Sequence, residues 1–228
     1  MRLIEYIVKT AKNINPQYSP SVIIDAGSRD LGQSIEFTNE FPTAQIYAFE
    51  PNPHQYQICV NLAREYKNIK VLPFALSDID GEATFHVTPS NIGVSSLLEP
   101  TDVPWGENSF YTITVKTVRL DKVLTELGVS KVDILWMDVQ GGELAALRGY
   151  GNFIENTDFV QCEASQFPYY KDHPLRPELE QFFEDNDYTH EFHLPFEGPP
   201  HQYMEGELVC INRKILKAKQ DENSMRSV

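Results

Sequence analysis

Short apolar runs alternate with longer segments of helical periodicity from Ser21 onward. The apolar runs predict buried strands at residues 22–24, 45–49, 69–74, 132–137 and 159–162. Apolar positions three and four apart predict helices between them at residues 31–41, 53–66, 120–127 and 142–148. This alternation is typical of an α/β domain built on a mainly parallel sheet.

Residues 81–118 interrupt this rhythm. Two stretches with alternating polar and apolar positions, residues 81–88 and 110–118, predict half-buried strands around a loop rich in Ser, Pro and Gly. A loop of this length inside a compact domain is usually functional, so we expect an antiparallel excursion at the mouth of the substrate site.

The two ends of the chain lie outside this alternation. Residues 1–20 predict an N-terminal helix and lead-in, and residues 21–213 the domain itself. Late in the domain we expect an acidic helix with a solvated face at residues 178–186 and an antiparallel pair of strands at residues 188–194 and 207–211. Residues 214–228 have the composition of a frayed tail.

Composition narrows the class of protein. The chain has 228 residues, with 33 acidic against 19 basic side chains and a formal net charge of −14. One α/β domain of roughly 200–250 residues accounts for this length. Because proteins bind phosphate backbones through Lys and Arg, the negative charge argues against a nucleic-acid partner.

The cellular location follows from what the sequence lacks. No run approaches the ~20 apolar residues of a membrane span, and the apolar run at the N-terminus is too broken for a signal peptide. Three widely separated cysteines do not suggest a disulfide framework. We therefore expect a cytoplasmic protein.

Four predicted strands end in an acidic residue, at Asp25, Glu50, Asp138 and Glu163. Ligands of open α/β sheets bind outside the carboxyl ends of the strands, so these side chains are expected at one crevice. Glu50 is placed to accept both hydroxyls of a ribose. Asp25 is placed to orient the first turn or to accept from a ligand ammonium, and Gly27 would let a ligand approach the backbone.

The glycines of the first turn do not suit a nicotinamide cofactor. Gly27 and Gly32 leave the G-x-G-x-x-G pattern incomplete, and Asp25 and Asp30 lie where two phosphates would bind. A nucleoside with a positive centre and no phosphates, such as S-adenosylmethionine, fits an acidic crevice better. A nicotinamide-dependent Rossmann oxidoreductase and a non-catalytic nucleoside-binding protein remain the alternatives.

Five short motifs follow one another along the chain. They are Ile24-Asp25-Ala26-Gly27-Ser28, Ala48-Phe49-Glu50-Pro51-Asn52-Pro53, Ala75-Leu76-Ser77-Asp78 with Gly81-Glu82, Thr117-Val118-Arg119-Leu120-Asp121, and Met137-Asp138-Val139-Gln140-Gly141-Gly142-Glu143. With these motifs the chain resembles the FkbM-type S-adenosylmethionine-dependent methyltransferases over about residues 20–165. The resemblance implies an α/β, Rossmann-like seven-stranded class I methyltransferase fold with a terminal antiparallel pair. It also implies O-methylation of a hydroxyl on a sugar or natural-product acceptor.

The resemblance further implies which residues contact the methyl donor. They are Asp25, Gly27 and Ser28 for the methionine part, Glu50 for the ribose with Pro51 beside it, and Ser77 and Asp78 for the adenine edge. The chain departs from the family at two positions. Arg29 replaces an asparagine, and its guanidinium suits a bidentate pair with the ligand carboxylate. Gln140 replaces a glutamate, which keeps hydrogen bonding and removes a charge.

Asp138 and Glu163 are the candidate catalytic residues, and Asp138 is also expected to contact the methyl donor. Methyl transfer to a hydroxyl needs oxygen, methyl and sulfur in line and a group that takes the hydroxyl proton. Asp138 is open to the roles of base, hydroxyl orienter or metal ligand, and with Glu163 it would suit Mg²⁺ or Ca²⁺. A divalent metal therefore stays possible, and a base at His173 or His193 is a further alternative.

Overall fold

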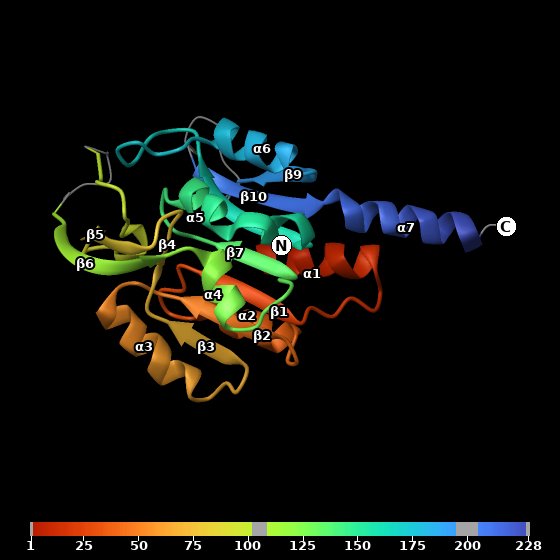
Figure 1. Cartoon of the computed structure of the whole chain (residues 1–228), viewed down its shortest axis with the longest axis horizontal. Coiled ribbons are helices and arrows are strands. Elements are labelled where there is room, and N and C mark those ends of the chain that lie inside the picture. Colours follow the sequence, from red (N-terminus) through yellow and green to blue (C-terminus); the bar gives the residue numbers. More distant parts are fainter. Residues whose placement is uncertain (1, 102–108, 195–204, 227–228) are drawn as a thin grey trace.

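The computed structural model describes residues 2–101, 109–194 and 205–226, with side chains as far as residue 219 (Figure 1). Its helices are α1 (Leu3–Ile14), α2 (Gly32–Glu40), α3 (Pro53–Ala63), α4 (Leu120–Glu126), α5 (Glu143–Tyr150), α6 (Arg176–Asp185) and α7 (Arg213–Arg226), with short 3-10 helices η1 (Ile92–Val94) and η2 (Gly151–Asn156). Its strands are β1 (Val22–Ala26), β2 (Gln45–Phe49), β3 (Ile69–Leu72), β4 (Ala75–Leu76), β5 (Gly81–Val87), β6 (Tyr111–Val118), β7 (Ile134–Met137), β8 (Phe159–Ser165), β9 (Tyr188–His193) and β10 (Glu205–Asn212). The α/β class expected from the sequence is confirmed.

A seven-stranded sheet forms the centre of the protein, in the order β3-β2-β1-β7-β8-β10-β9. Strands β3, β2, β1, β7 and β8 are parallel, and β10 runs antiparallel to both β8 and β9. The predicted terminal antiparallel pair is therefore confirmed. The strand order reverses direction at β1 and β7, which is where ligands bind in sheets of this type.

Alternation of buried side chains along the strands builds a core on each face of this sheet. Ile23 packs with helices α1, α2 and α3 on one face, whereas its neighbour Ile24 packs with α4, α5 and α6 on the other. Successive side chains of a strand point to opposite faces, so a strand buried on both sides is apolar throughout. This explains the continuous apolar runs that predicted the strands.

A second, smaller sheet with the order β4-β6-β5 lies beside the carboxyl edge of the main sheet (Figure 1). Strands β5 and β6 are antiparallel, as the alternating pattern predicted. The predicted strand at residues 69–74 ends earlier, at Leu72, as β3 of the main sheet, and β4 of the small sheet follows it as a separate strand. Residues 102–108 of the predicted loop lie outside the described residues.

Two expectations about the C-terminal third were wrong. Glu163 does not end its strand, because β8 continues to Ser165 in register with Glu205 of β10. The expected frayed tail begins instead as helix α7, which projects from the body of the protein in Figure 1. Ile215 and Leu216 pack against the core that includes α1, and this apolar contact stabilises the start of the helix.

Gly149 sets how closely α5 approaches the loop after β4. A Cβ atom at Gly149 would lie 1.9 Å from the carbonyl oxygen of Ser77, so only glycine fits there. We predict that Gly149→Ala lowers the free energy of unfolding by about 3 kcal/mol or more, measured by urea denaturation. Gly128→Ala is the matched control, since nothing lies within 4 Å of its Cβ position and only its positive φ of 71° opposes the change; it should cost about 1 kcal/mol. Equal costs would contradict this account.

Candidate active site

A cavity opens at the carboxyl ends of β1, β2 and β7. The residues that line it are Gly27, Arg29, Phe49, Glu50, Pro51, Phe74, Ala75, Leu76, Phe85, Gly93, Ser95, Leu97, Asp138, Val139, Gln140 and Gly142. Four of the five sequence motifs contribute to this lining, together with residues beside them, β5 and the segment around η1. The cavity thus lies at the edge where the strand-end carboxylates predicted a ligand.

Gly27 brings the first turn into contact with the end of β7. Its φ is +88°, and a Cβ atom there would lie 1.8 Å from the carbonyl oxygen of Asp138. A larger residue would force the two strand ends apart. Arg29, the next turn residue that lines the cavity, has a φ of +45°. Its side chain reaches over Gly93, where an added Cβ atom would lie 3.0 Å from Nη1 of Arg29.

Glu50 presents a carboxylate that backbone donors hold in place. Its Oε1 atom accepts from the backbone N–H of Asn52 at 2.8 Å, and its Oε2 atom accepts from the backbone N–H of Arg29 at 2.9 Å. Each oxygen keeps acceptor capacity for a ligand hydroxyl. Burial raises the pKa of Glu50 to about 7, against the lowering effect of the two N–H donors.

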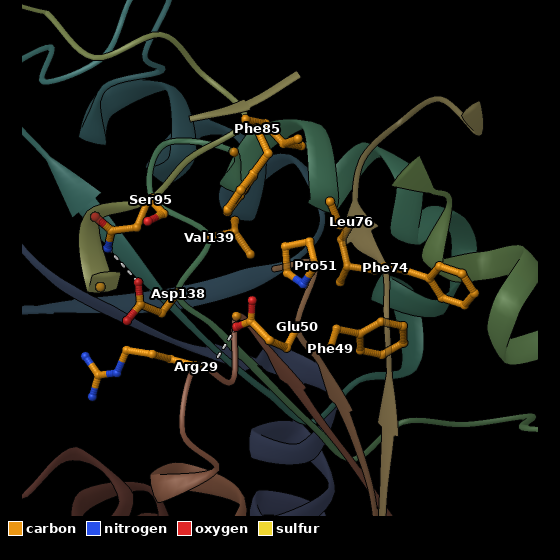
Figure 2. Close-up of a pocket in the computed structure, with 16 residues that line it drawn as sticks. Arg29, Phe49, Glu50, Pro51, Phe74, Leu76, Phe85, Ser95, Asp138 and Val139 are labelled. Carbon is orange, nitrogen blue, oxygen red and sulfur yellow. Dashed lines mark hydrogen bonds between the residues drawn. The ribbon is translucent and has the colours of Figure 1, made fainter. Parts of the chain in front are cut away.

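The cavity changes from polar to apolar along its length. Figure 2 shows Arg29 and Asp138 at one end, Glu50 and Pro51 between, and Phe49 and Leu76 grouped at the other end. A ligand that matches this order has a charged group, then a diol, then a flat apolar ring. S-adenosylmethionine has these three parts in this order.

Asp138 lies at the polar end and is tied to Glu163 through Gln140. The Nε2 atom of Gln140 donates to Oδ1 of Asp138 at 2.6 Å and to Oε2 of Glu163 at 2.6 Å. Asp138 and Gln140 line the cavity, whereas Glu163 lies beyond them. Of the two predicted catalytic carboxylates, Asp138 is therefore the one that faces the cavity.

Carboxylates crowd the sheet edge beyond Gln140. Burial raises the pKa of Glu163 well above 4.5, and the neighbouring carboxylates Asp138, Glu205, Glu207 and Glu143 raise it further. Burial likewise raises the pKa of Asp138, while the hydrogen bond from Gln140 lowers it. Desolvation disfavours the ionised form, so these groups take up protons more readily than exposed acids do.

Comparison with known proteins identifies the family. The sequence profile of the Methyltransferase FkbM domain matches residues 25–189, which is more than half of the chain. The chain belongs to the FkbM methyltransferase family. It is 30% identical over 206 residues to the 2-O-methyltransferase NoeI of Sinorhizobium fredii, covering 85% of this chain and 80% of NoeI. It is also 30% identical over 121 residues to the hexuronic acid methyltransferase AglP of Haloferax volcanii, covering 53% of this chain and 47% of AglP.

Solved structures show the same fold. Magnesium protoporphyrin IX methyltransferase from Synechocystis, with SAM bound, superposes with a TM-score of 0.52 and 11% identity, covering 92% of this chain and 78% of that one. A putative methyltransferase from Streptococcus mutans in complex with SAH also gives 0.52, at 9% identity, covering 92% and 99%. This FkbM protein therefore has the class I methyltransferase fold.

Four of the predicted donor-binding residues do not line the cavity. Asp25 is buried below it, where its Oδ2 atom accepts from Ser34 Oγ at 2.5 Å, and burial raises its pKa to about 6. Ser28 is also buried and donates to the backbone oxygen of Asp25. Ser77 and Asp78 follow directly after Ala75 and Leu76, which do line it. Their roles toward the donor stay predictions.

The described residues do not support the divalent metal that the sequence leaves possible. No group of three or more His, Cys, Asp or Glu side chains there is arranged to hold an ion. The amide nitrogen of Gln140 lies between Asp138 and Glu163, within hydrogen-bond distance of both. An amide donor in this position opposes a cation shared by the two carboxylates.

The two candidate histidine bases lie away from the cavity lining. His173 packs edge-on against Tyr170, with ring centroids 5.4 Å apart, and burial lowers its pKa to about 4. It is therefore neutral at pH 7 and a weak base. His193, on β9, packs at a tilt against Tyr6 of α1, with ring centroids 4.7 Å apart. Neither lines the cavity.

Several lining residues were not predicted. Phe85 belongs to β5, and Gly93, Ser95 and Leu97 belong to η1 and its flanks. Their segment was assigned to the substrate mouth, but single residues in an irregular loop carry no periodic signal. Phe74 immediately precedes the third family motif, so its position next to that motif could have indicated it.

No helix among the described residues is long and apolar enough to cross a membrane.

The buried carboxylates give the protein a predictable pH dependence of stability. Burial raises the pKa of Glu143 to about 8, and that of Glu207, like that of Glu50, to about 7. Above pH 4.5 the folded protein thus binds more protons than the unfolded chain, and its stability falls as pH rises toward 8. We predict a free energy of unfolding lower by about 1–3 kcal/mol at pH 8.5 than at pH 6.0, measured by urea denaturation.

Glu143→Gln tests the assignment, because it removes one buried titrating group at nearly constant size. The variant should lose less stability between pH 6.0 and pH 8.5 than the parent protein does. Glu65→Gln, at an exposed position in the turn that follows α3, is the matched control and should leave the loss unchanged. A parent protein that is more stable at pH 8.5 would refute the prediction.

Proposed function

We propose that this protein is an S-adenosylmethionine-dependent O-methyltransferase acting on a hydroxyl of a sugar or natural-product acceptor. The observation that carries the proposal is the cavity that places the braced carboxylate of Glu50 between an apolar end and Asp138. The family membership supports methyl transfer, and the geometry supports the donor.

The residues present fit the donor part by part. Glu50 would accept the two ribose hydroxyls, and Phe49 and Leu76, which line the other end of the cavity, would enclose the adenine. At the polar end, Arg29 is available to the carboxylate of the methionine part, while Asp138 favours a positive centre. The carboxylates near Asp138 add to this negative potential, so a cationic donor is favoured over a phosphorylated nucleotide.

S-adenosylmethionine would supply a methyl group activated by its positive sulfur. Asp138 would accept the proton of the acceptor hydroxyl, whose oxygen bonds to the methyl carbon as that carbon leaves the sulfur. The raised pKa of Asp138 makes this carboxylate a stronger base than an exposed aspartate. Glu163 supports Asp138 through Gln140 and does not contact the acceptor directly.

The names of the relatives favour a sugar acceptor. NoeI is a 2-O-methyltransferase, and AglP is a hexuronic acid methyltransferase. Exposed aromatic side chains near the small sheet, Phe110 and Tyr111, offer apolar faces of the kind on which sugar rings pack. The acceptor would approach from this side, past the segment around η1.

Glu50 gives the proposal a binding test. We predict that Glu50→Gln weakens binding of S-adenosylhomocysteine roughly 10- to 100-fold, because it removes the ionised acceptor of both ribose hydroxyls. Isothermal titration calorimetry would measure the change, and Glu65→Gln should bind as the parent does. Because ligand favours ionised Glu50, whose pKa is about 7, affinity of the parent protein should fall as pH drops from 8 to 6. Glu50→Gln should lack this dependence, and a parent without it would contradict the assigned role.

The activity test follows transfer of a labelled methyl group to a panel of sugars. We expect the label on an acceptor that offers a free hydroxyl, none on the matching deoxy sugar, and at least 100-fold slower transfer by Asp138→Asn. Thermal stabilisation by NAD(P) but not by S-adenosylhomocysteine would favour the oxidoreductase alternative. Binding of S-adenosylhomocysteine without transfer to any acceptor would favour the non-catalytic alternative.

A further inference from the structure

The backbone of Gln140 has a conformation that residues with a side chain adopt only where surrounding contacts hold it. Its φ is +54°, an unusual value for a residue with a side chain, and the residue is 9% exposed. The strain persists where surrounding contacts fix the conformation. Here the contacts come from four different parts of the chain.

The amide nitrogen of Gln140 uses both of its hydrogens on carboxylates. One goes to Oδ1 of Asp138 and the other to Oε2 of Glu163, each at 2.6 Å. A primary amide has two N–H donors, so this nitrogen has none left. Because the amide is neutral, it donates to both carboxylates without adding another buried charge.

The other polar atoms of Gln140 are anchored from the opposite side. Its Oε1 atom accepts from the hydroxyl of Tyr170 at 2.9 Å, and its backbone oxygen accepts from Ser96 Oγ at 2.6 Å. The Tyr170 hydroxyl also lies 3.0 Å from the backbone oxygen of Val94, next to η1. Burial raises the pKa of Tyr170, which keeps the hydroxyl protonated and able to donate.

We propose that Gln140 is a positioning residue for methyl transfer, whose amide holds Asp138 toward the acceptor hydroxyl and is itself fixed by Tyr170 and Ser96. Gln140 binds one oxygen of Asp138 and leaves the other for the proton of the acceptor. It also joins Asp138 to the segment around η1 that lines the donor cavity. The inference rests on the proposed function.

The surroundings of Asp138 show why a neutral donor matters there. The charged groups that act on it are Asp25 on β1, Arg29 after β1, Glu143 on α5, Glu163 on β8, and Glu205 and Glu207 on β10. Five of these six are acids, and each disfavours an ionised Asp138. The Gln140 amide opposes them by a hydrogen bond to the ionised form, which is the form able to accept a proton.

Gln140→Met tests the proposal, because methionine has nearly the same length and fills the space without donating. We expect kcat to fall at least tenfold, and the dissociation constant for S-adenosylhomocysteine to change by a much smaller factor, because Gln140 is one of many residues that line the donor cavity. Carbon-13 NMR titration of the Asp138 carboxyl, assigned with Asp138→Asn, should show its pKa higher by about one unit. Tyr170→Phe should shift both quantities in the same direction by less.

Gln161→Met is the matched control. Gln161 is also a buried amide that donates to a carboxylate, that of Glu207, but it does not contact Asp138. This variant should lose stability without raising the pKa of Asp138. The proposal is overturned if Gln140→Met leaves the pKa and kcat unchanged, or if kcat and donor affinity fall in parallel. If the parent protein transfers no methyl group, the proposed function fails, whereas the NMR titration still tests the role of Gln140.

Discussion

The burial of carboxylates among neutral donors is the interaction on which this active site depends. Ser34 holds Asp25, backbone N–H groups hold Glu50, and the Gln140 amide holds Asp138. A buried charge needs hydrogen bonds or a partner of opposite sign. Arg29, the cation that acts on Asp138, is half exposed and pairs with Asp30. The site therefore carries negative potential that protein cations leave largely uncompensated.

This imbalance connects stability with function. It raises the pKa values of the buried acids and makes the folded state less stable as they ionise. A ligand that brings a positive centre to Asp138 and two hydroxyl donors to Glu50 would stabilise the ionised form of each carboxylate. The close approach of Gly27 to Asp138 keeps these groups around one cavity. Under the proposed function, the same buried carboxylates that lower the stability of the fold favour the binding of a cationic nucleoside.

Much of the fold could be predicted from the sequence, because strands buried on both faces are apolar throughout, as at residues 22–24 and 45–49. Glu50, Asp138 and Gly27 could be placed because strand ends of a parallel sheet converge. Asp25 and Glu163 could not be separated from them, since an apolar run shows neither the last residue of a strand nor which way its side chains point; both residues lie inside their strands. The helix at Arg213–Arg226 depends on tertiary contacts of Ile215 and Leu216 that local sequence does not reveal.

Gln140 joins the two halves of the site in a way that neither half explains alone. A carboxylate in its place would add a charge between Asp138 and Glu163 and would need a proton to donate to either. The amide donates to both at any pH, and its oxygen accepts from Tyr170. Tyr170 also contacts the backbone oxygen of Val94 in η1, and Ser96 donates to the backbone oxygen of Gln140. The wall of the donor cavity and the Asp138 carboxylate at its end therefore form one hydrogen-bonded unit. A displacement of either therefore disturbs the other, which makes the departure from glutamate at this position a feature of how the site is assembled.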